Sequence, residues 1–69
     1  MERTPIESST IKSIGHAGTI LEVEFKSGTI YQYKGVQKPA AKKLMDAKSI
    51  GAEFGRSIRD NYPHIKIRG

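Results

Sequence analysis

Hydrophobic and polar residues alternate along the segment Thr19–Lys26. Leu21 and Val23 occupy one set of alternate positions, and charged residues occupy most of the other set. This two-residue period is typical of a strand in a sheet that is buried on one face. Thr29–Val36 is rich in β-branched and aromatic residues and predicts a second strand. Ser8–His16 predicts a short strand before these two.

The length of the turn between the two clearer strands decides which way two tyrosines face. A two-residue turn would place Tyr31 and Tyr33 on the charged side of the sheet. A three-residue turn that ends at a left-handed Gly28 would pair Val23 with Tyr31 and Leu21 with Tyr33. Because strand register follows the buried face, the sequence favours the three-residue turn. Both tyrosines then join the apolar side.

The remaining segments give weaker signals of strand or turn. Gly15 together with Gly18 predicts the turn that follows the first strand. The N-terminal residues 1–7 have no regular pattern, so we expect a flexible arm. Residues 63–69 alternate isoleucines with basic residues, which is compatible with a short edge strand or a basic tail.

After Gly35 the hydrophobic period changes to that of helices. Pro39–Lys48 begins with a proline, which suits the first turn of a helix, and continues with good helix formers. Ser49 is a suitable N-cap for a second helix. The apolar positions of this second helix recur every four residues, at Ile50, Phe54, Ile58 and Tyr62.

The predicted fold is α+β with two layers. An antiparallel β-meander of about three strands is followed by two short helices that pack on one sheet face. Residues 8–62 form the single domain, because 69 residues allow only one small core. Homo-oligomerisation would be a reasonable source of additional stability.

Composition excludes several classes of protein. The chain has no cysteine, which rules out disulfides and thiolate metal sites. No apolar run approaches the roughly 20 residues of a membrane span, and the N-terminus lacks a signal-peptide core, so we expect a cytoplasmic protein. His16 and His64 lie far apart without acids at ligand-like spacing, and no serine is paired with a histidine and an acid. We therefore expect no metal, no cofactor and no enzymatic activity.

Charge is distributed unevenly between the two halves of the chain. The net charge is +5, but residues 1–33 carry −1 and residues 34–69 carry +6. A basic half suggests an anionic partner such as nucleic acid, a nucleotide, an acidic protein or a membrane surface. A soluble surface with an excess of lysine is the alternative interpretation.

Four cations on the two predicted helices are candidates for phosphate binding. They are Lys42, Lys43, Arg56 and Arg59. Arg56 and Arg59 are one helical turn apart and would share a phosphate, although Asp60 would neutralise Arg56 as an i,i+4 pair. The alternative is an ordinary solvated helical face.

The aromatic residues and the start of the second helix offer further candidate contacts. Tyr31, Tyr33 or Tyr62 would stack on a nucleobase if exposed, although two core tyrosines are the alternative. Ser49 and Gly51 lie where free N–H groups at a helix N-terminus favour an anion. A plain N-cap is the alternative at this position.

An ordered set of short motifs also points to a known family. The set comprises Ser8-Ser9-x-Ile11, Ile14-Gly15, Leu21-x-Val23-x-Phe25-x-x-Gly28-x-x-Tyr31-x-Tyr33, Val36, Leu44-x-x-Ala47-x-Ser49-x-Gly51-x-x-Phe54 and Ile58-x-x-x-Tyr62. Together these motifs resemble the KTSC domain, a short domain named for the C-terminus of some lysyl-tRNA synthetases that also occurs as a stand-alone protein. The resemblance implies RNA binding and no catalytic residue.

These observations lead to two functional hypotheses. The first is a non-enzymatic binding module that takes an anionic ligand, RNA or a nucleotide, on a basic helical face. The second is a small regulatory or inhibitory protein of a phage or mobile element, which docks on a host protein or sequesters nucleotide signalling molecules as a homo-oligomer.

Overall fold

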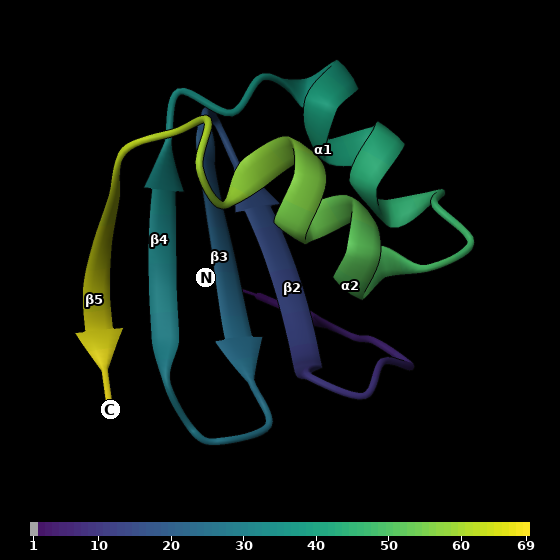
Figure 1. Ribbon diagram of the computed structural model, residues 1–69. Helices are drawn as coiled ribbons and strands as arrows, with labels where there is room; N and C mark the ends of the chain where they lie inside the picture. The colour runs from purple at the N-terminus through teal and green to yellow at the C-terminus, as the bar shows by residue number, and fades with distance from the viewer. Residues whose placement is uncertain (1) are drawn as a thin grey trace.

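The alternating segments of the sequence form one antiparallel sheet, and the helices pack on one of its faces (Figure 1). The computed structural model describes residues 2–69. In chain order the elements are β1 (Thr4–Pro5), β2 (Ile11–Ala17), β3 (Ile20–Phe25), β4 (Ile30–Lys34), α1 (Lys38–Met45), α2 (Ile50–Glu53), the π-helix η1 (Phe54–Ile58) and β5 (His64–Arg68). The five strands lie in the sheet in the same order as in the chain, each antiparallel to the next.

The sheet has five strands, whereas the sequence predicted about three. Part of the expected N-terminal arm, Thr4–Pro5, pairs with Ile14 and Ser13 of β2. Met1, the first residue of that arm, lies outside the described residues. The C-terminal segment forms an edge strand next to β4, not a tail. Both added strands are exposed on every residue, so neither carries the buried alternation by which strands are recognised.

The hairpin of β3 and β4 has the predicted register. Leu21 pairs with Tyr33, and Val23 pairs with Tyr31. Gly28 has a φ of 98°, a left-handed conformation in which a side chain would be strained, and its N–H donates to the Phe25 carbonyl at 2.9 Å. The three-residue turn is therefore confirmed, and both tyrosines face the helices.

The preceding turn lies further along the chain than predicted. Strand β2 continues through Gly15, which pairs with Glu22, and the turn falls at Gly18 and Thr19. Gly15 instead allows a close approach, because a Cβ at this position would clash with the Glu2 carbonyl oxygen. This glycine gives room to the N-terminal segment that leads into β1.

The core lies between the helix-facing side of the sheet and the helices. It consists of Ile11, Ile14, Leu21, Val23, Tyr33, Val36, Ala41, Leu44, Phe54 and Ile58. Helix α1 has its proline in the first turn and buries Ala41 and Leu44. Helix α2 begins after Ser49, whose hydroxyl accepts the Ala52 N–H at 3.4 Å, as the capping pattern predicted.

The second helix changes its geometry after one turn. From Phe54 to Ile58 it is a π-helix, in which the Arg59 N–H donates to the Phe54 carbonyl at 3.0 Å, five residues back. The wider turn alters which side chains face one another along the last part of the helix. No helix within residues 2–69 has the length and apolar character needed to cross a membrane.

Candidate functional site

The space between η1 and the sheet is incompletely filled beside β4 and β5. A cleft of about 630 Å³ remains, within the usual range of small-molecule sites. Its walls come from β3, β4, β5, α2, η1 and the turn after η1. The lining residues are Thr10, Phe25, Tyr31, Tyr33, Gly51, Phe54, Gly55, Arg59, Asp60 and His64.

Aromatic rings form the inner surface of the cleft. Tyr33 is only 3% exposed, and its ring centroid lies 5.4 Å from Phe54 and 5.2 Å from His64. The half-buried rings of Phe25 and Tyr31 lie 5.9 Å apart in an edge-to-face arrangement. Such contacts fix the ring positions without a ligand. The cleft therefore presents a preformed aromatic surface.

The rim of the cleft carries one cation and one carboxylate. The Arg59 guanidinium lies 3.8 Å from the Asp60 carboxylate, and both side chains are mostly exposed. A pair of this kind is held weakly in water, so Arg59 can exchange its partner for a ligand anion. Burial raises the pKa of the Tyr33 phenol, with Tyr31 adding to the shift and Arg59 opposing it. Tyr33 consequently stays a neutral hydroxyl at physiological pH.

Two glycines on the second helix leave the cleft open. Gly51, Gly55 and Arg59 follow one another at intervals of four residues and all line it. A Cβ at Gly51 would lie 3.2 Å from the Ser8 hydroxyl oxygen, so this glycine lets the segment before β2 approach the helix. A Cβ at Gly55 would meet no atom within 4 Å among the described residues. The space beside Gly55 belongs to the cleft.

Two smaller hollows adjoin the cleft and share the Thr10 side of its wall. One, of about 360 Å³, lies between the residues before β2 and the start of α2, and it includes Lys48. The other, also about 360 Å³, follows the start of the β3–β4 turn and includes Lys26. Serine and threonine hydroxyls line both hollows. Each hollow thus places hydroxyl groups and one lysine beside the cleft.

The structure brings together only part of the set of residues predicted from the sequence. Tyr31, Tyr33, Gly51 and Arg59 line the cleft, and Ser49 lines the adjoining hollow. The predicted contacts Lys42, Lys43, Arg56 and Tyr62 are absent from the cleft lining among residues 2–69. Tyr62 is half-buried and packs against the core.

Two of the cations outside the cleft form ion pairs with acidic neighbours. Lys42 donates to Asp46 at 2.8 Å on the exposed face of α1. Arg56 donates to the buried Glu53, whose pKa is lowered first by a hydrogen bond from Ser57 and then by that from Arg56. A shared phosphate would have to compete with these carboxylates.

The predicted pair of Arg56 with Asp60 is wrong. Arg56 pairs with Glu53, three residues earlier, and Asp60 lies beside Arg59. The i,i+4 expectation assumed a regular α-helix, whereas Phe54–Ile58 is a π-helix with hydrogen bonds between residues five apart, so side chains four positions apart are no longer aligned.

Sequence reasoning missed three side chains of the cleft in particular. Phe25 and Phe54 occupy apolar periodic positions that indicate the core, and nothing indicated that one side of each ring would stay open. Two glycines on one short helix, Gly51 and Gly55, are compatible with close approach by a backbone or a ligand as well as with plain tolerance, and both line the cleft. His64 lies opposite Tyr33 in the register of β4 and β5, which depends on where the turn after η1 brings the chain back.

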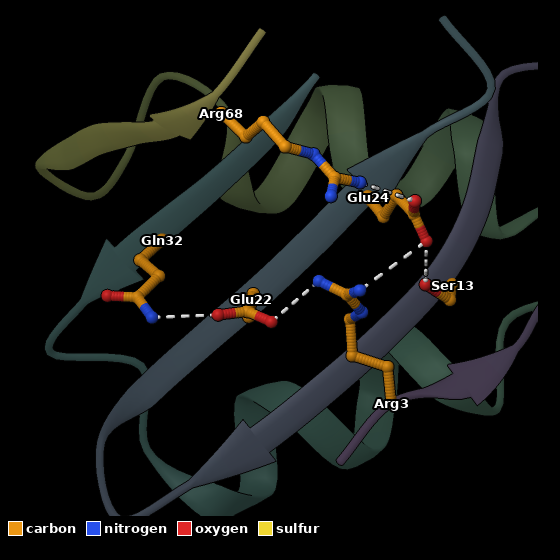
Figure 2. A network of polar contacts seen from close by, with 6 residues as sticks. All are labelled: Arg3, Ser13, Glu22, Glu24, Gln32 and Arg68. Carbon is orange, nitrogen blue, oxygen red and sulfur yellow. Dashed lines mark hydrogen bonds and ion pairs between the residues drawn. The ribbon is translucent and has the colours of Figure 1, made fainter. Parts of the chain in front are cut away.

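The opposite face of the sheet is closed by a polar network (Figure 2). Glu24 accepts the Ser13 hydroxyl at 2.8 Å and Arg68 at 3.3 Å, and Arg3 bonds Glu22 at 2.7 Å. The Ser13 hydrogen bond is the main cause that lowers the Glu24 pKa. Within residues 2–69 no group of three or more acidic or histidine side chains is placed to hold a metal ion.

Known proteins match nearly the whole chain in sequence and in fold. A crystal structure of a KTSC domain protein from Yersinia pestis superimposes with a TM-score of 0.92, with 37% identity and 96% of each chain covered. An uncharacterized protein of Stutzerimonas stutzeri (strain A1501) is 34% identical over 64 residues, which span 90% of either chain. The family model of the KTSC domain matches residues 7–62. The chain therefore belongs to the KTSC domain family.

Proposed function

We propose that this protein is a non-enzymatic module that binds single-stranded RNA and takes one nucleobase into the aromatic cleft. The observation that carries the proposal is the combination of a preformed aromatic surface with a cation at its rim. Tyr31 and His64 expose part of their rings, and Arg59 lies beside them. A planar base that carries a phosphate matches both features.

The shape of the surface around the cleft favours a strand over a free mononucleotide. The adjoining hollows extend the cleft on its Thr10 side, and Lys26 and Lys48 line them. Hydroxyl groups and lysines are common partners of phosphate and sugar oxygens. A chain of several nucleotides is long enough to contact the cleft and both hollows, whereas a mononucleotide would contact only the cleft.

Charge and family resemblance support the same ligand. The C-terminal part of the chain from Lys34 carries a net charge of +6, which attracts a polyanion. The resemblance to the domain at the C-terminus of some lysyl-tRNA synthetases implies contact with RNA. A cytoplasmic location, where RNA is abundant, is part of the proposal.

The test is a fluorescence anisotropy titration with a labelled single-stranded octaribonucleotide of mixed sequence at several salt concentrations. We expect the logarithm of the association constant to fall with the logarithm of salt concentration, with a slope of about −0.7 for each phosphate contact. A mononucleotide should bind more weakly than the octamer. Absence of binding at low salt, or a flat salt dependence, would contradict the proposal.

A matched pair of charge variants distinguishes the cleft from the helical face predicted from the sequence. Arg59→Gln removes a cation at the cleft rim, and Lys42→Gln removes one that is paired with Asp46 on α1. We expect only the first variant to weaken binding strongly and to reduce the salt slope by about one contact. Equal effects of the two variants would place the RNA on the helices instead.

A third variant fills the cleft without changing the charge of the protein. Because a Cβ at Gly55 meets open space, Gly55→Leu should fold and occupy the position of the base. The expected result is loss of RNA binding with an unchanged or higher thermal midpoint. Retained binding by a folded Gly55→Leu protein would exclude the cleft as the site.

A further inference from the structure

Strand β5 leaves the sheet with an open edge of five residues. It is the last strand in the sheet order and pairs with β4 on one side, while all of its residues from His64 to Arg68 are exposed. The opposite edge of the sheet, β1, has only two residues. An open edge offers backbone donors and acceptors to another extended chain.

The hydrogen-bond pattern shows which backbone groups of β5 are turned outward. The Lys34 N–H donates to the Pro63 carbonyl at 2.9 Å, so this pair belongs to the hydrogen-bonded class. Hydrogen-bonded and non-hydrogen-bonded pairs alternate in an antiparallel ladder. The backbone N–H and C=O groups of Ile65 therefore point toward β4. The N–H and C=O groups of His64 and Lys66 are consequently directed away from the sheet.

The side chains of β5 combine apolar and basic character. Ile65 and Ile67 are the large hydrophobic residues that remain exposed within the described chain, at 44% and 48%. Ile65 lies opposite Gln32, on the face away from the helices, and Lys66 lies opposite Tyr31 on the helix-facing side. A strand that pairs with this edge would meet Ile65 on the outer face and Lys66 on the helix-facing side, while the register shift after Lys66 leaves Ile67 without a partner residue in β4.

The charge of the edge selects among partners. Antiparallel pairing of two β5 strands about Lys66 would set this lysine opposite its own copy, and no acid lies between Pro63 and Gly69 to offset the repulsion. We propose that β5 binds an extended acidic segment of another protein by strand addition, with glutamate or aspartate opposite Lys66 and an apolar residue on the face of Ile65. This surface shares His64 with the cleft, but the proposal does not depend on RNA binding.

The test uses a synthetic capped peptide of seven residues in which glutamate and valine alternate. NMR titration of the full chain should shift the amide signals of His64 and Lys66 and slow their exchange with solvent. The same peptide with lysine in place of glutamate should not bind. Binding of both peptides alike, binding of neither, or shifts that spare Lys66 would overturn the proposal.

Two substitutions at one position separate the backbone contribution from charge. Lys66→Pro removes an outward N–H that the pairing with β4 does not use, and proline is tolerated on edge strands. We expect Lys66→Pro to lower the affinity for the glutamate peptide about tenfold, as for a lost hydrogen bond. Lys66→Gln should lower this affinity less. Equal affinities of Lys66→Pro and the unchanged protein would overturn strand addition.

A charge reversal and a measurement of size complete the design if the proline variant does not fold. Lys66→Glu should reverse the order of affinities, so that the lysine peptide binds more tightly than the glutamate peptide. An unchanged order would contradict the proposal. Sedimentation velocity of the full chain should show a monomer. A dimer in which the His64 and Lys66 amides are protected from exchange would make a second copy the occupant and would overturn the acidic partner.

Discussion

The two faces of the sheet differ in how completely they are covered, although the same strands supply both. On the helix-facing side, alternate residues such as Leu21, Val23 and Tyr33 are buried under the helices. On the opposite side, Glu22 and Glu24 are bonded to residues that come from both ends of the chain (Figure 2). One face is apolar with a gap, and the other is polar and closed.

This difference indicates where a ligand is expected. Buried carboxylates can resemble a functional site, but within residues 2–69 no buried side-chain nitrogen or oxygen lacks a hydrogen-bond partner. The aromatic face is covered by two short helices over β2 and β3, while β4 and β5 extend beyond them (Figure 1). Incomplete coverage, more than the position of charges, creates the candidate site.

The largest expected effect comes from the covered part of the apolar face. Leu21→Ala truncates a fully buried side chain and should lower the free energy of unfolding by about 2–5 kcal/mol. Gln32→Ala, its counterpart on the polar face, removes one hydrogen bond to Glu22 and should cost about 1 kcal/mol. Urea denaturation measures both. Similar losses would mean that the two faces stabilise the fold equally.

The next effect concerns the open part of the same face. Tyr31→Leu keeps an apolar side chain against the core but removes the ring, and loss of one stacked base should weaken RNA binding by about 1–3 kcal/mol. Tyr31→Phe retains the ring and is the control. Anisotropy titration measures the affinity. If the leucine and phenylalanine variants bind equally, the ring does not stack on a base.

A smaller effect, dependent on pH, is expected on the polar face. The pKa of Glu24 is lowered from its ordinary value of 4.5 in the folded protein, chiefly by the Ser13 hydrogen bond. Its stabilising contribution is therefore complete above the unfolded value and is lost as the pH falls through the lower folded value. Glu24→Gln should be less stable than the unchanged protein near neutral pH.

Measurements at acidic pH provide the control for this experiment. Urea midpoints of the two proteins should converge as the pH falls below the ordinary Glu24 pKa of 4.5 and through its lower folded value, because a protonated Glu24 and a glutamine are both uncharged. A difference that stays constant over this interval would show that the carboxylate charge contributes nothing to the stability of the outer face.

The sequence predicted those parts of the fold that have a buried periodic pattern. The alternation in β3 and the glycine at position 28 determined the hairpin register, and Ser49 marked the start of the second helix. The strands β1 and β5 bury no residue. The alternation of isoleucine and basic residues in 63–69 therefore left an edge strand and a tail both open, and β1 had no periodic signal at all.

The cleft was predicted only in part for a related reason. Tyr31 and Arg59 were candidates by residue type, but the space between them depends on how far the helices extend over the sheet. The π-helical turn after Glu53 also changed the pairing of Arg56, which ordinary helical spacing does not anticipate. Fold and register follow from local patterns, whereas a cleft depends on what the tertiary packing leaves unfilled.

The smallest effect tests whether this unfilled space serves binding at the expense of stability. Gly55 needs no left-handed conformation, and its Cβ would meet open space, so Gly55→Ala should raise the free energy of unfolding by about 0.5–1 kcal/mol through helix propensity. Gly28→Ala is the matched control, because Gly28 also faces open space but has a φ of 98°, and it should be destabilising.

Thermal denaturation compares the two variants, and anisotropy shows whether Gly55→Ala weakens RNA binding as the cleft narrows. A Gly55→Ala protein that is less stable than the unchanged chain would mean that the glycine supports the fold, and that the gap on the aromatic face is a by-product of packing.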